Sequence, residues 1–376
     1  MVGSLTIPLF AIRHKQIGGT EFAIYNLIRG LAQTSVQTEV FYDREQHLSP
    51  EFGAWLKGNS QIASVPSLEI PGPKNIRFLQ ETLFEWGRRK SGWVLYPNYF
   101  VPPRRPFSTH QASVILHDIQ YKVLPNYHSA ARKAWLDTYL PWLLNRADSI
   151  VLISQSEKHY VEQFFGVKPA EKCDVVYNAI DWDRFAGYES APSNRLTELL
   201  SRPYLLTVCH QFPHKNLQTL LTAFDQLAGR HPDLQLYMVG TDSASNREFV
   251  ATKLSATRER VRLLGFLSDQ DLGLLYRNAK LFVLPSLYEG FGMPAVEALG
   301  LGTPILVSGT TALPEVTLGL GSYVENPKDV DAWIWQIDSM ISANDRPTPA
   351  TVQKLRNTYS PLSIAQSLLS VLRKRG

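Results

Sequence analysis

The chain has few of the residues that mark several large classes of protein. Only two cysteines, Cys173 and Cys209, occur among 376 residues, which excludes a disulfide framework and a cysteine-rich metal cluster. No apolar run approaches the roughly 20 residues that a membrane-spanning helix needs. Charged residues make up 19% and the net charge is +4, too small an excess to predict a nucleic-acid-binding surface. We therefore expect an ordinary globular protein in the reducing cytoplasm.

Two fingerprints of ligand sites are also missing. Residues 5–20 are typical of a strand, a loop with Gly18 and Gly19, and a helix start, but the G-x-G-x-x-G spacing is absent. This argues against a nicotinamide dinucleotide site and an oxidoreductase. No D-x-D pattern follows a predicted strand end to hold a divalent cation. We therefore expect neither a bound metal nor a cofactor.

Short apolar segments alternate with helical patterns along the chain. A chain of 376 residues predicts two domains, and strands alternating with helices predict doubly wound α/β domains. The predicted strands are 5–12, 36–42, 61–65, 93–96, 112–116, 149–153 and 174–177, followed by 203–209, 234–240, 261–265, 281–284, 303–308 and 322–325. The main predicted helices are 20–33, 78–90, 130–145, 215–227, 268–278, 293–299 and 362–374.

The most informative stretch is LFVLPSLYEGFGMPAVEAL, residues 281–299. It predicts a buried strand, a glycine loop, and a helix with Pro294 in its first turn, where a missing N–H costs nothing. The free amides and the dipole of such a helix start favour an anion. Two carboxylates, Glu289 and Glu297, flank this site. Carboxylates accept hydrogen bonds from hydroxyl groups, and both sugars and ribose supply them.

The two acids stand in the pattern E-G-F-G-x-P-x-x-E-A, with seven residues between them. This pattern resembles the E-x7-E signature of retaining glycosyltransferases with the GT-B architecture, most closely glycosyltransferase family 4. The resemblance implies an α/β fold of two Rossmann-like, doubly wound domains facing a central cleft. It places an acceptor-side domain at 1–185 and a nucleotide-sugar-binding domain at 186–360, with a C-terminal helix at 361–376 that returns to the first domain.

The resemblance also implies a donor site. The family carries a basic loop of the form G-x-x-x-P-R-K-N, and this chain has CHQFPHKN, so Lys215 is predicted to stabilise the leaving diphosphate. Glu289 is predicted to accept hydroxyls of the donor sugar as a catalytic residue, and Glu297 those of the ribose. The predicted donor-binding residues are Gly18, Gly19, His210, Lys215, Gly240, Phe266, Leu267, Glu289, Gly290, Phe291, Gly292, Met293 and Glu297.

On the acceptor side, His117 directly follows the predicted strand 112–116, and residues at such strand ends face the crevice of a parallel sheet. By resemblance His117 is the third predicted catalytic residue and lies beside the donor sugar, with the acceptor entering near Gly18 and Gly19. The implied reaction is metal-independent transfer of mannose, glucose or a similar sugar, with retained configuration. The donor is a nucleotide-diphosphate sugar, and the acceptor is a glycan or lipid-linked glycan of a cell-surface polysaccharide such as lipopolysaccharide.

Alternatives remain open from the residues alone. A sugar-nucleotide 2-epimerase would use the same donor and fold without an acceptor, and a small-molecule glycosyltransferase would differ only in its acceptor. A non-catalytic scaffold is disfavoured because Lys215, Glu289 and Glu297 are all present. Basic residues at 88–90 and 104–105 lie among aromatics that include Trp86, Trp93 and Tyr96, a mixture that predicts peripheral contact with the inner face of the membrane.

Overall fold

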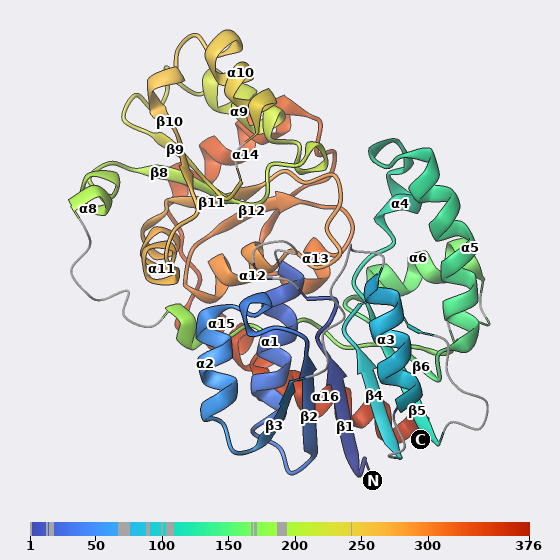
Figure 1. Ribbon diagram of the computed structural model, residues 1–376. Coiled ribbons are helices and arrows are strands. Elements are labelled where there is room, and N and C mark those ends of the chain that lie inside the picture. The colour runs from blue at the N-terminus through green and yellow to red at the C-terminus, as the bar shows by residue number, and fades with distance from the viewer. Residues whose placement is uncertain are drawn as a thin grey trace. The chain divides into compact units, whose positions relative to one another are not determined.

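The computed structural model describes residues 2–12, 14, 19–66, 76–87, 91–98, 101–102, 109–166, 168, 171–185, 194–241 and 243–376, with the backbone alone at 76–81 and 194–195. The chain divides into two compact units (Figure 1). The first comprises Met1–Ile180 and Tyr359–Gly376, and the second comprises Asp181–Thr358. Each unit contains one parallel β-sheet with helices between its strands.

The first unit is built on a seven-stranded parallel sheet of order β3-β2-β1-β4-β5-β6-β7. The strand order reverses between β1 and β4, which defines the switch point of a doubly wound sheet. The strands are β1 (Ser4–Pro8), β2 (Gln37–Tyr42), β3 (Ile62–Pro66), β4 (Gly92–Tyr96), β5 (His110–Leu116), β6 (Ser149–Leu152) and β7 (Cys173–Val175). The helices are α1 (Gly19–Leu31), α2 (Pro50–Gly58), α3 (Ile76–Gly87), α4 (Gln120–Val123), α5 (Ala130–Arg146), α6 (Gln155–Phe165) and α16 (Pro361–Arg375).

The second unit is built on a six-stranded parallel sheet of order β10-β9-β8-β11-β12-β13, with its switch point between β8 and β11. The strands are β8 (Tyr204–Val208), β9 (Gln235–Val239), β10 (Val261–Gly265), β11 (Leu281–Leu284), β12 (Ile305–Ser308) and β13 (Ser322–Val324). The helices are α8 (Asn194–Leu200), α9 (Leu217–Gln226), α10 (Ala244–Lys253), α11 (Asp269–Asn278), α12 (Met293–Gly300), α13 (Leu313–Val316), α14 (Val330–Ala343) and α15 (Pro349–Thr358).

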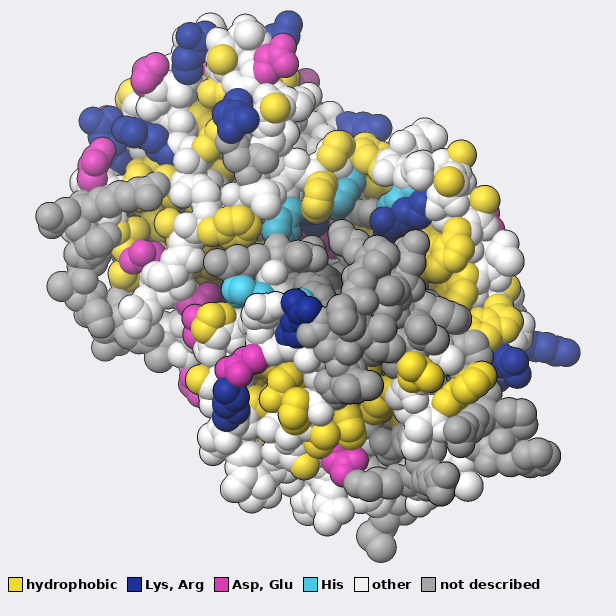
Figure 2. All heavy atoms as spheres, viewed as in Figure 1, with side chains coloured by type: hydrophobic (Ala, Val, Ile, Leu, Met, Phe, Trp, Pro, Cys, Tyr) yellow, Lys and Arg dark blue, Asp and Glu magenta, His cyan; other side chains and the backbone are white. Residues whose placement is uncertain are grey.

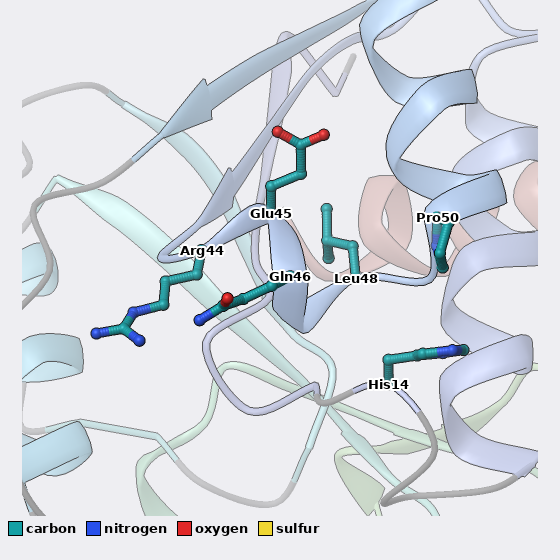
Figure 3. Close-up of a pocket in the computed structure, with 6 residues that line it drawn as sticks. All are labelled: His14, Arg44, Glu45, Gln46, Leu48 and Pro50. Atoms are coloured by element: carbon teal, nitrogen blue, oxygen red, sulfur yellow. The ribbon is translucent and has the colours of Figure 1, made fainter.

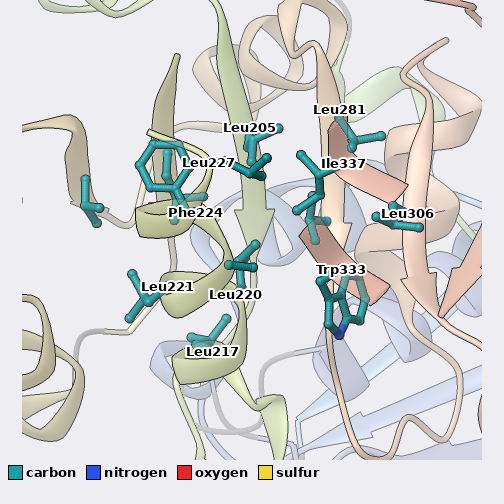
Figure 4. Packing of buried hydrophobic residues seen from close by; sticks show 14 of the residues in the cluster. Leu205, Leu217, Leu220, Leu221, Phe224, Leu227, Leu281, Leu306, Trp333 and Ile337 are labelled. Carbon is teal, nitrogen blue, oxygen red and sulfur yellow. The ribbon is translucent and has the colours of Figure 1, made fainter. Parts of the chain in front are cut away.

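The core of the second unit shows why its strands have continuous apolar sequences. Leucines of α9 pack with Leu205 of β8 and Leu281 of β11, and Trp333 and Ile337 of α14 join the same cluster (Figure 4). Trp333 also donates a hydrogen bond from Nε1 to the carbonyl of Pro327 at 3.0 Å. Because helices cover both faces of a parallel sheet, its central strands need apolar side chains on both faces. The sheet therefore presents its functional groups at strand ends rather than on its faces.

The predicted doubly wound architecture is confirmed, and the predicted strands all occur with small shifts at their ends. The predicted strand 5–12 ends earlier, at Pro8, although the amide of Leu9 still bonds the carbonyl of Phe41. The predicted cap Ser268 accepts a hydrogen bond from the amide of Asp271 at 3.1 Å. Helices α14 and α15 fill the segment after β13, for which the sequence interpretation gave no element.

The division between the units lies at residues 180 and 181, earlier than the predicted 185 and 186. The residues after the division form a short 3₁₀ helix, η3 (Trp182–Phe185), and Phe185 packs edge-on against Tyr276 of α11. At the other end, α16 packs against α1 in the first unit.

The predicted membrane-facing surface needs one correction. Trp93 and Tyr96 belong to β4 and are only 3% and 2% exposed, because this strand lies at the centre of its sheet. They are core residues and cannot contact a bilayer. Trp86 remains exposed at the end of α3, whereas the basic residues at 88–90 and 104–105 lie outside the described residues.

Candidate functional site

The second unit brings most of the predicted donor-site residues to one edge of its sheet. Strands β8 and β11 are neighbours at the switch point and end at Val208 and Leu284. The loops that follow them, 209–216 and 285–292, carry Lys215 and Glu289. Ligands of open α/β sheets bind at such a point, beyond the carboxyl ends of the strands.

Lys215 and Glu289 form an ion pair across these two loops. Nζ of Lys215 lies 2.7 Å from Oε1 of Glu289, and the same oxygen accepts a hydrogen bond from Oγ of Ser286 at 2.7 Å. Both charged side chains are largely buried, so salt screens their attraction less than that of a surface pair. An ammonium group has three N–H donors. Lys215 can therefore bind a phosphate oxygen while it still contacts Glu289.

The local backbone holds Lys215 in this position. Residues Pro213–Lys215 form a short 3₁₀ helix, η4, that Pro213 begins with its fixed φ. Asn216 then adopts a left-handed conformation with φ 54°, which asparagine tolerates better than most residues. Its Nδ2 donates hydrogen bonds to the carbonyls of Pro285 at 3.1 Å and Pro327 at 2.7 Å. Asn216 thus connects the loop 209–216, which carries Lys215, to the loop 285–292, which carries Glu289.

The loop 285–292, which carries Glu289, ends at the N-terminus of α12. Gly292 caps this helix with φ 87°, and a Cβ there would collide with Leu313. The backbone amide of Glu289 donates to Oγ1 of Thr311 at 3.0 Å, which fixes the loop to the turn after β12. Pro294 has no N–H and the amides of Ala295 and Val296 donate to the carbonyl of Gly292, so the positive end of the α12 dipole is what favours a negatively charged ligand here. The remaining predicted residues of this segment are Gly290, which is half-buried, and Phe291 and Met293, which are buried.

Glu297 lies in α12 and is engaged on both carboxylate oxygens. Oε2 accepts a hydrogen bond from the hydroxyl of Tyr276 at 3.0 Å, and Oε1 lies 3.3 Å from Nη2 of Arg184. The carboxylate is only 4% exposed, and the guanidinium of Arg184 stacks on the ring of Phe185. Sequence reasoning predicted Glu297 but missed Arg184 and Tyr276. The only feature of the sequence that points to Arg184 is its position beside Phe185, immediately before the predicted domain boundary at 185 and 186.

The charges in this network stabilise one another. Burial alone would lower the pKa of the Arg184 guanidinium, but the nearby carboxylates of Glu297 and Asp269 raise it above its usual value. Burial and the charge of Glu297 raise the pKa of the Tyr276 hydroxyl well above its usual value. Tyr276 therefore stays protonated and donates to Glu297.

The residues that follow β8, β9 and β10 lie at the same edge of the sheet, at the carboxyl ends of these strands. Gly240 has φ 124°, and a Cβ there would run into the carbonyl of Cys209, so only glycine fits. Its amide donates to the carbonyl of Gly265 at 3.0 Å, which joins the turns after β9 and β10. His210 lies between them, and burial together with the charge of Lys215 lowers the pKa of its imidazole. After Gly265, Phe266 is exposed and Leu267 is half-buried.

In the first unit, His117 lies directly after β5, as predicted. Its Nε2 donates to the carbonyl of Pro97, after β4, at 3.0 Å. Burial lowers the pKa of His117, and this outweighs the Pro97 carbonyl and the charge of Asp118. The imidazole is therefore neutral near pH 7, with Nδ1 as a hydrogen-bond acceptor. Gly19 is the first residue of α1, and Gly18 lies outside the described residues.

A pocket of about 790 Å³ opens near the ends of β1 and β2 in the first unit. Nδ1 of His14 lies 2.8 Å from Oε1 of the buried Glu21 in α1, which orients the imidazole. The ring of His14 points towards α1, while the other lining residues come from the segment between β2 and α2 and from Pro50, the first residue of α2 (Figure 3). The lining residues are His14, Arg44, Glu45, Gln46, Leu48 and Pro50.

The described residues contain neither a cluster of metal-binding side chains nor a helix able to span a membrane. No three His, Cys, Asp or Glu side chains among them lie close enough together to hold a metal ion. None of the described helices combines the length and the apolar content that crossing a bilayer requires.

Two family models match the chain, one to each half. The model described as Glycosyltransferase Family 4 matches residues 17–184, and that described as Glycosyl transferases group 1 matches residues 193–356. With the two doubly wound sheets, these matches define an enzyme of the GT-B glycosyltransferase class. The chain belongs to glycosyltransferase family 4, as its E-x7-E pattern predicted.

Individual relatives agree with this assignment. O-antigen chain mannosyltransferase B from Escherichia coli is 31% identical over 263 residues, which cover 68% of this chain and 67% of that protein. The serotype-specific mannosyltransferase WbdA from Escherichia coli is 29% identical over 250 residues, which cover 65% of this chain but only 30% of that longer protein. The crystal structure of HepE from Anabaena, solved with UDP-glucose, shares the fold with a TM-score of 0.67 at 16% identity, and the match covers 99% of each chain.

Proposed function

We propose that this glycosyltransferase transfers a hexose from a nucleotide-diphosphate donor to a glycan or lipid-linked acceptor of a cell-surface polysaccharide. Mannose is the first candidate for the transferred sugar. The observation that carries the proposal is the Lys215–Glu289 ion pair at the switch point of the second sheet, beside the start of α12. The 31% identity to an O-antigen mannosyltransferase supports the choice of mannose and of a surface glycan.

The proposed roles follow from the donors and acceptors that each residue presents. Lys215 and the positive end of the α12 dipole bind the diphosphate and stabilise the charge that develops on it. The two hydrogen bonds described for the carboxylate of Glu289 both end on Oε1, so Oε2 can accept from a sugar hydroxyl. Glu297 accepts the ribose hydroxyls from its buried position. His117 accepts a hydroxyl of the donor sugar through Nδ1.

We further propose retention of the anomeric configuration without a covalent enzyme intermediate and without a metal. The acceptor hydroxyl attacks the anomeric carbon from the face that the diphosphate leaves, and its proton passes to the leaving phosphate oxygen. Glu289 is held by Lys215 and Ser286, so it acts as a hydrogen-bond acceptor and not as a nucleophile. The stereochemistry is tested by NMR of the product, in which the one-bond C1–H1 coupling of the new glycosidic linkage distinguishes the α from the β anomer.

The direct experiment is a thermal-shift panel of UDP-, GDP- and ADP-sugars, followed by transfer assays with mannose-containing acceptors. A ligand that binds only the folded enzyme raises its Tm, so the panel identifies the donor. Transfer that depends on an added acceptor supports the proposal. Conversion of a sugar nucleotide to its 2-epimer without an acceptor would instead establish the epimerase alternative.

We also propose that the enzyme works in the cytoplasm with peripheral contact at the inner face of the membrane. Cys173 and Cys209 are both free thiols, which fits a reducing compartment. The exposed Trp86 supplies an aromatic group of the kind that inserts at a bilayer surface. Flotation with anionic liposomes at low salt tests this contact. Protein that stays at the bottom of the gradient refutes it without touching the assignment as a transferase.

A further inference from the structure

Thr311, in the turn between β12 and α13, has a backbone conformation that its residue type disfavours. Its φ is 56°, in the left-handed region, where a Cβ comes too close to the following carbonyl oxygen. Three other described non-glycine residues share this conformation, Asn216, Leu318 and Asn344, but Thr311 alone among the four is branched at Cβ. A β-branched residue in this region is an outlier. Such outliers persist where the surrounding structure over-determines them, and they are typical of functional sites.

The conformation of Leu318 has a local cause that Thr311 lacks. Leu318 follows α13, and the amide of Gly319 donates to the carbonyl of Pro314 at 3.0 Å, which is the arrangement that commonly ends a helix with one left-handed residue. The two asparagines adopt the conformation because their short polar side chains tolerate it. Thr311 precedes α13 and ends no helix. The cause of its conformation therefore lies in what this turn contacts.

The turn holds the main chain of Glu289 at both of its polar groups. Oγ1 of Thr311 accepts the amide of Glu289 at 3.0 Å, and the amide of Ala312 donates to the carbonyl of Glu289 at 3.3 Å. On its other side, the turn is fixed by the amide of Gly309, which donates to the carbonyl of Val324 in β13 at 2.8 Å. The left-handed residue lets the chain change direction between these two anchors. Two successive residues thus satisfy the whole backbone of the predicted catalytic glutamate.

The orientation of Glu289 depends on such contacts. Figure 2 shows acidic and basic side chains on the surface of the second unit, where water solvates them in many orientations. Glu289 is only 9% exposed, so protein groups set its direction. Lys215 and Ser286 hold its carboxylate through Oε1. With Oε1 fixed in this way, the position of the Glu289 main chain determines where Oε2 lies.

We propose that Thr311 is a positioning residue that places Glu289 for contact with the donor sugar, and that its strained conformation is retained for this contact and not for stability. The inference rests on the proposed function, because it requires Glu289 to act on the donor. The hydroxyl of Thr311 does the positioning, since it accepts the amide of Glu289 itself. Catalytic geometry has to be held within about 0.5 Å, so a small displacement of Glu289 lowers the rate strongly.

Single variants of the full chain separate the hydroxyl from the backbone conformation. Thr311→Val keeps the shape and the branching but loses the hydroxyl, so kcat should fall about 10- to 100-fold. KM for the donor should change by less than about threefold, because Lys215 and Glu297 still bind the nucleotide. Thr311→Ser keeps the hydroxyl and should retain at least about half of the wild-type kcat. Wild-type kcat in Thr311→Val, or an equal loss in Thr311→Ser, overturns the inference.

Thr311→Gly and Leu318→Gly form a matched pair, because both relieve a φ of 56°. We expect both variants to fold, with Tm close to or above that of the wild type. Thr311→Gly should nevertheless lose as much kcat as Thr311→Val, whereas Leu318→Gly, outside the turn that bonds Glu289, should keep it. Full activity in Thr311→Gly would show that the hydroxyl positions nothing and would overturn the inference.

A double-mutant cycle tests whether Thr311 acts through Glu289. Glu289→Gln should lower kcat by itself, and adding Thr311→Val should lower it by less than about twofold further, because the positioned carboxylate is already gone. Losses that multiply would overturn the inference. Low activity in Glu289→Gln beside full activity in Thr311→Val refutes the positioning role alone. Full activity in Glu289→Gln refutes the role of Glu289 in the proposed function, and the inference with it.

Hydrogen exchange gives a readout that does not depend on the reaction. In the segment 285–292, the amide of Glu289 should exchange faster in Thr311→Val and Thr311→Gly than in the wild type, because it loses its acceptor. Thr311→Ser and Leu318→Gly should exchange as the wild type does. Unchanged exchange in Thr311→Val would show that its hydroxyl does not hold Glu289 in solution and would overturn the inference.

Discussion

The two switch points of this molecule have the same topology but very different loops. In the second unit, the loops after β8 and β11 are joined by the Lys215–Glu289 pair and by the bonds of Asn216, and Tyr276 and Arg184 hold Glu297 below them. In the first unit, the loops after β4 and β5 are joined by the bond of His117 to the carbonyl of Pro97, and those after β1 and β2 by the bond of the His14 amide to the carbonyl of His47. A donor site that must recognise one diphosphate benefits from pre-organised charges. A site for a variable acceptor benefits from loops that the fold constrains less.

The largest expected effect comes from Lys215→Ala. Removing a group that stabilises the developing charge of the leaving diphosphate should lower kcat/KM by about 100- to 1,000-fold. Lys215→Arg keeps the charge and should retain part of the activity. The measurement is initial rate of transfer at subsaturating donor, with Tm recorded for each variant to show that it is folded.

The matched control is Lys57→Ala in the first unit. Lys57 pairs with Glu45 at 2.6 Å, almost the same distance as the Lys215–Glu289 pair, but both partners are more than half exposed. Such exposed pairs contribute little to stability because water and salt screen them, so activity and Tm should barely change. Near-wild-type turnover by Lys215→Ala would show that Lys215 does not bind the diphosphate as proposed.

The next largest effect is on stability, from Glu297→Ala. Removing the carboxylate leaves the buried guanidinium of Arg184 without its closest acceptor, and breaking a buried pair in this way costs about 3 kcal/mol of unfolding free energy. Transfer should fall as well, because the ribose loses its acceptor. Urea denaturation measures the loss, and Tyr276→Phe, which removes only the hydroxyl, should cost about 1 kcal/mol.

Glu198→Ala provides the comparison within the same unit. Glu198 lies 3.9 Å from Arg262 in an exposed pair, and its removal should change the unfolding free energy by less than about 0.5 kcal/mol. Equal losses in Glu297→Ala and Glu198→Ala would mean that the Arg184–Glu297 contact does not form in solution.

A smaller effect is expected on the pH dependence of the unfolding free energy, from His117 at the strand ends of the first unit. The pKa of His117 is lowered by burial, so the folded protein resists protonation that the unfolded chain accepts below about pH 6.5. The unfolding free energy should therefore fall as pH drops from 7.5 to about 5.5, by roughly 1 kcal/mol from this residue. His117→Gln should show a shallower decline between these two pH values in urea denaturation. Parallel curves for wild type and variant would show that the folded protein does not lower the pKa of His117.

The same contrast explains how much could be predicted from sequence. The strand and helix pattern was predictable because apolar runs, caps such as Ser268 and glycine loops act locally. The proximity of Lys215 and Glu289 was accessible through a family resemblance, since each motif is a short local pattern. Arg184 and Tyr276 were not, because their link to Glu297 depends on the packing of α11 and η3 against α12. Trp93 was misjudged because an aromatic residue in a short strand has the same local sequence in a core as at a surface.

The smallest expected effect is that of EDTA, which should leave the rate of transfer unchanged. Lys215 and the positive end of the α12 dipole supply positive charge of the kind that a divalent cation would otherwise bring to a diphosphate. The chain contains three D-x-D sequences, at 181–183, 269–271 and 329–331, and among the described residues no three His, Cys, Asp or Glu side chains are grouped closely enough to hold a metal ion. In the first, the amide of Asp183 donates to a carboxylate oxygen of Asp181, and in the second, Asp269 and Asp271 stand two positions apart in the first turn of α11, a spacing that directs their side chains to different faces. Activity that EDTA abolishes and Mn²⁺ restores would mean that a metal, and not Lys215 alone, holds the diphosphate at the second switch point.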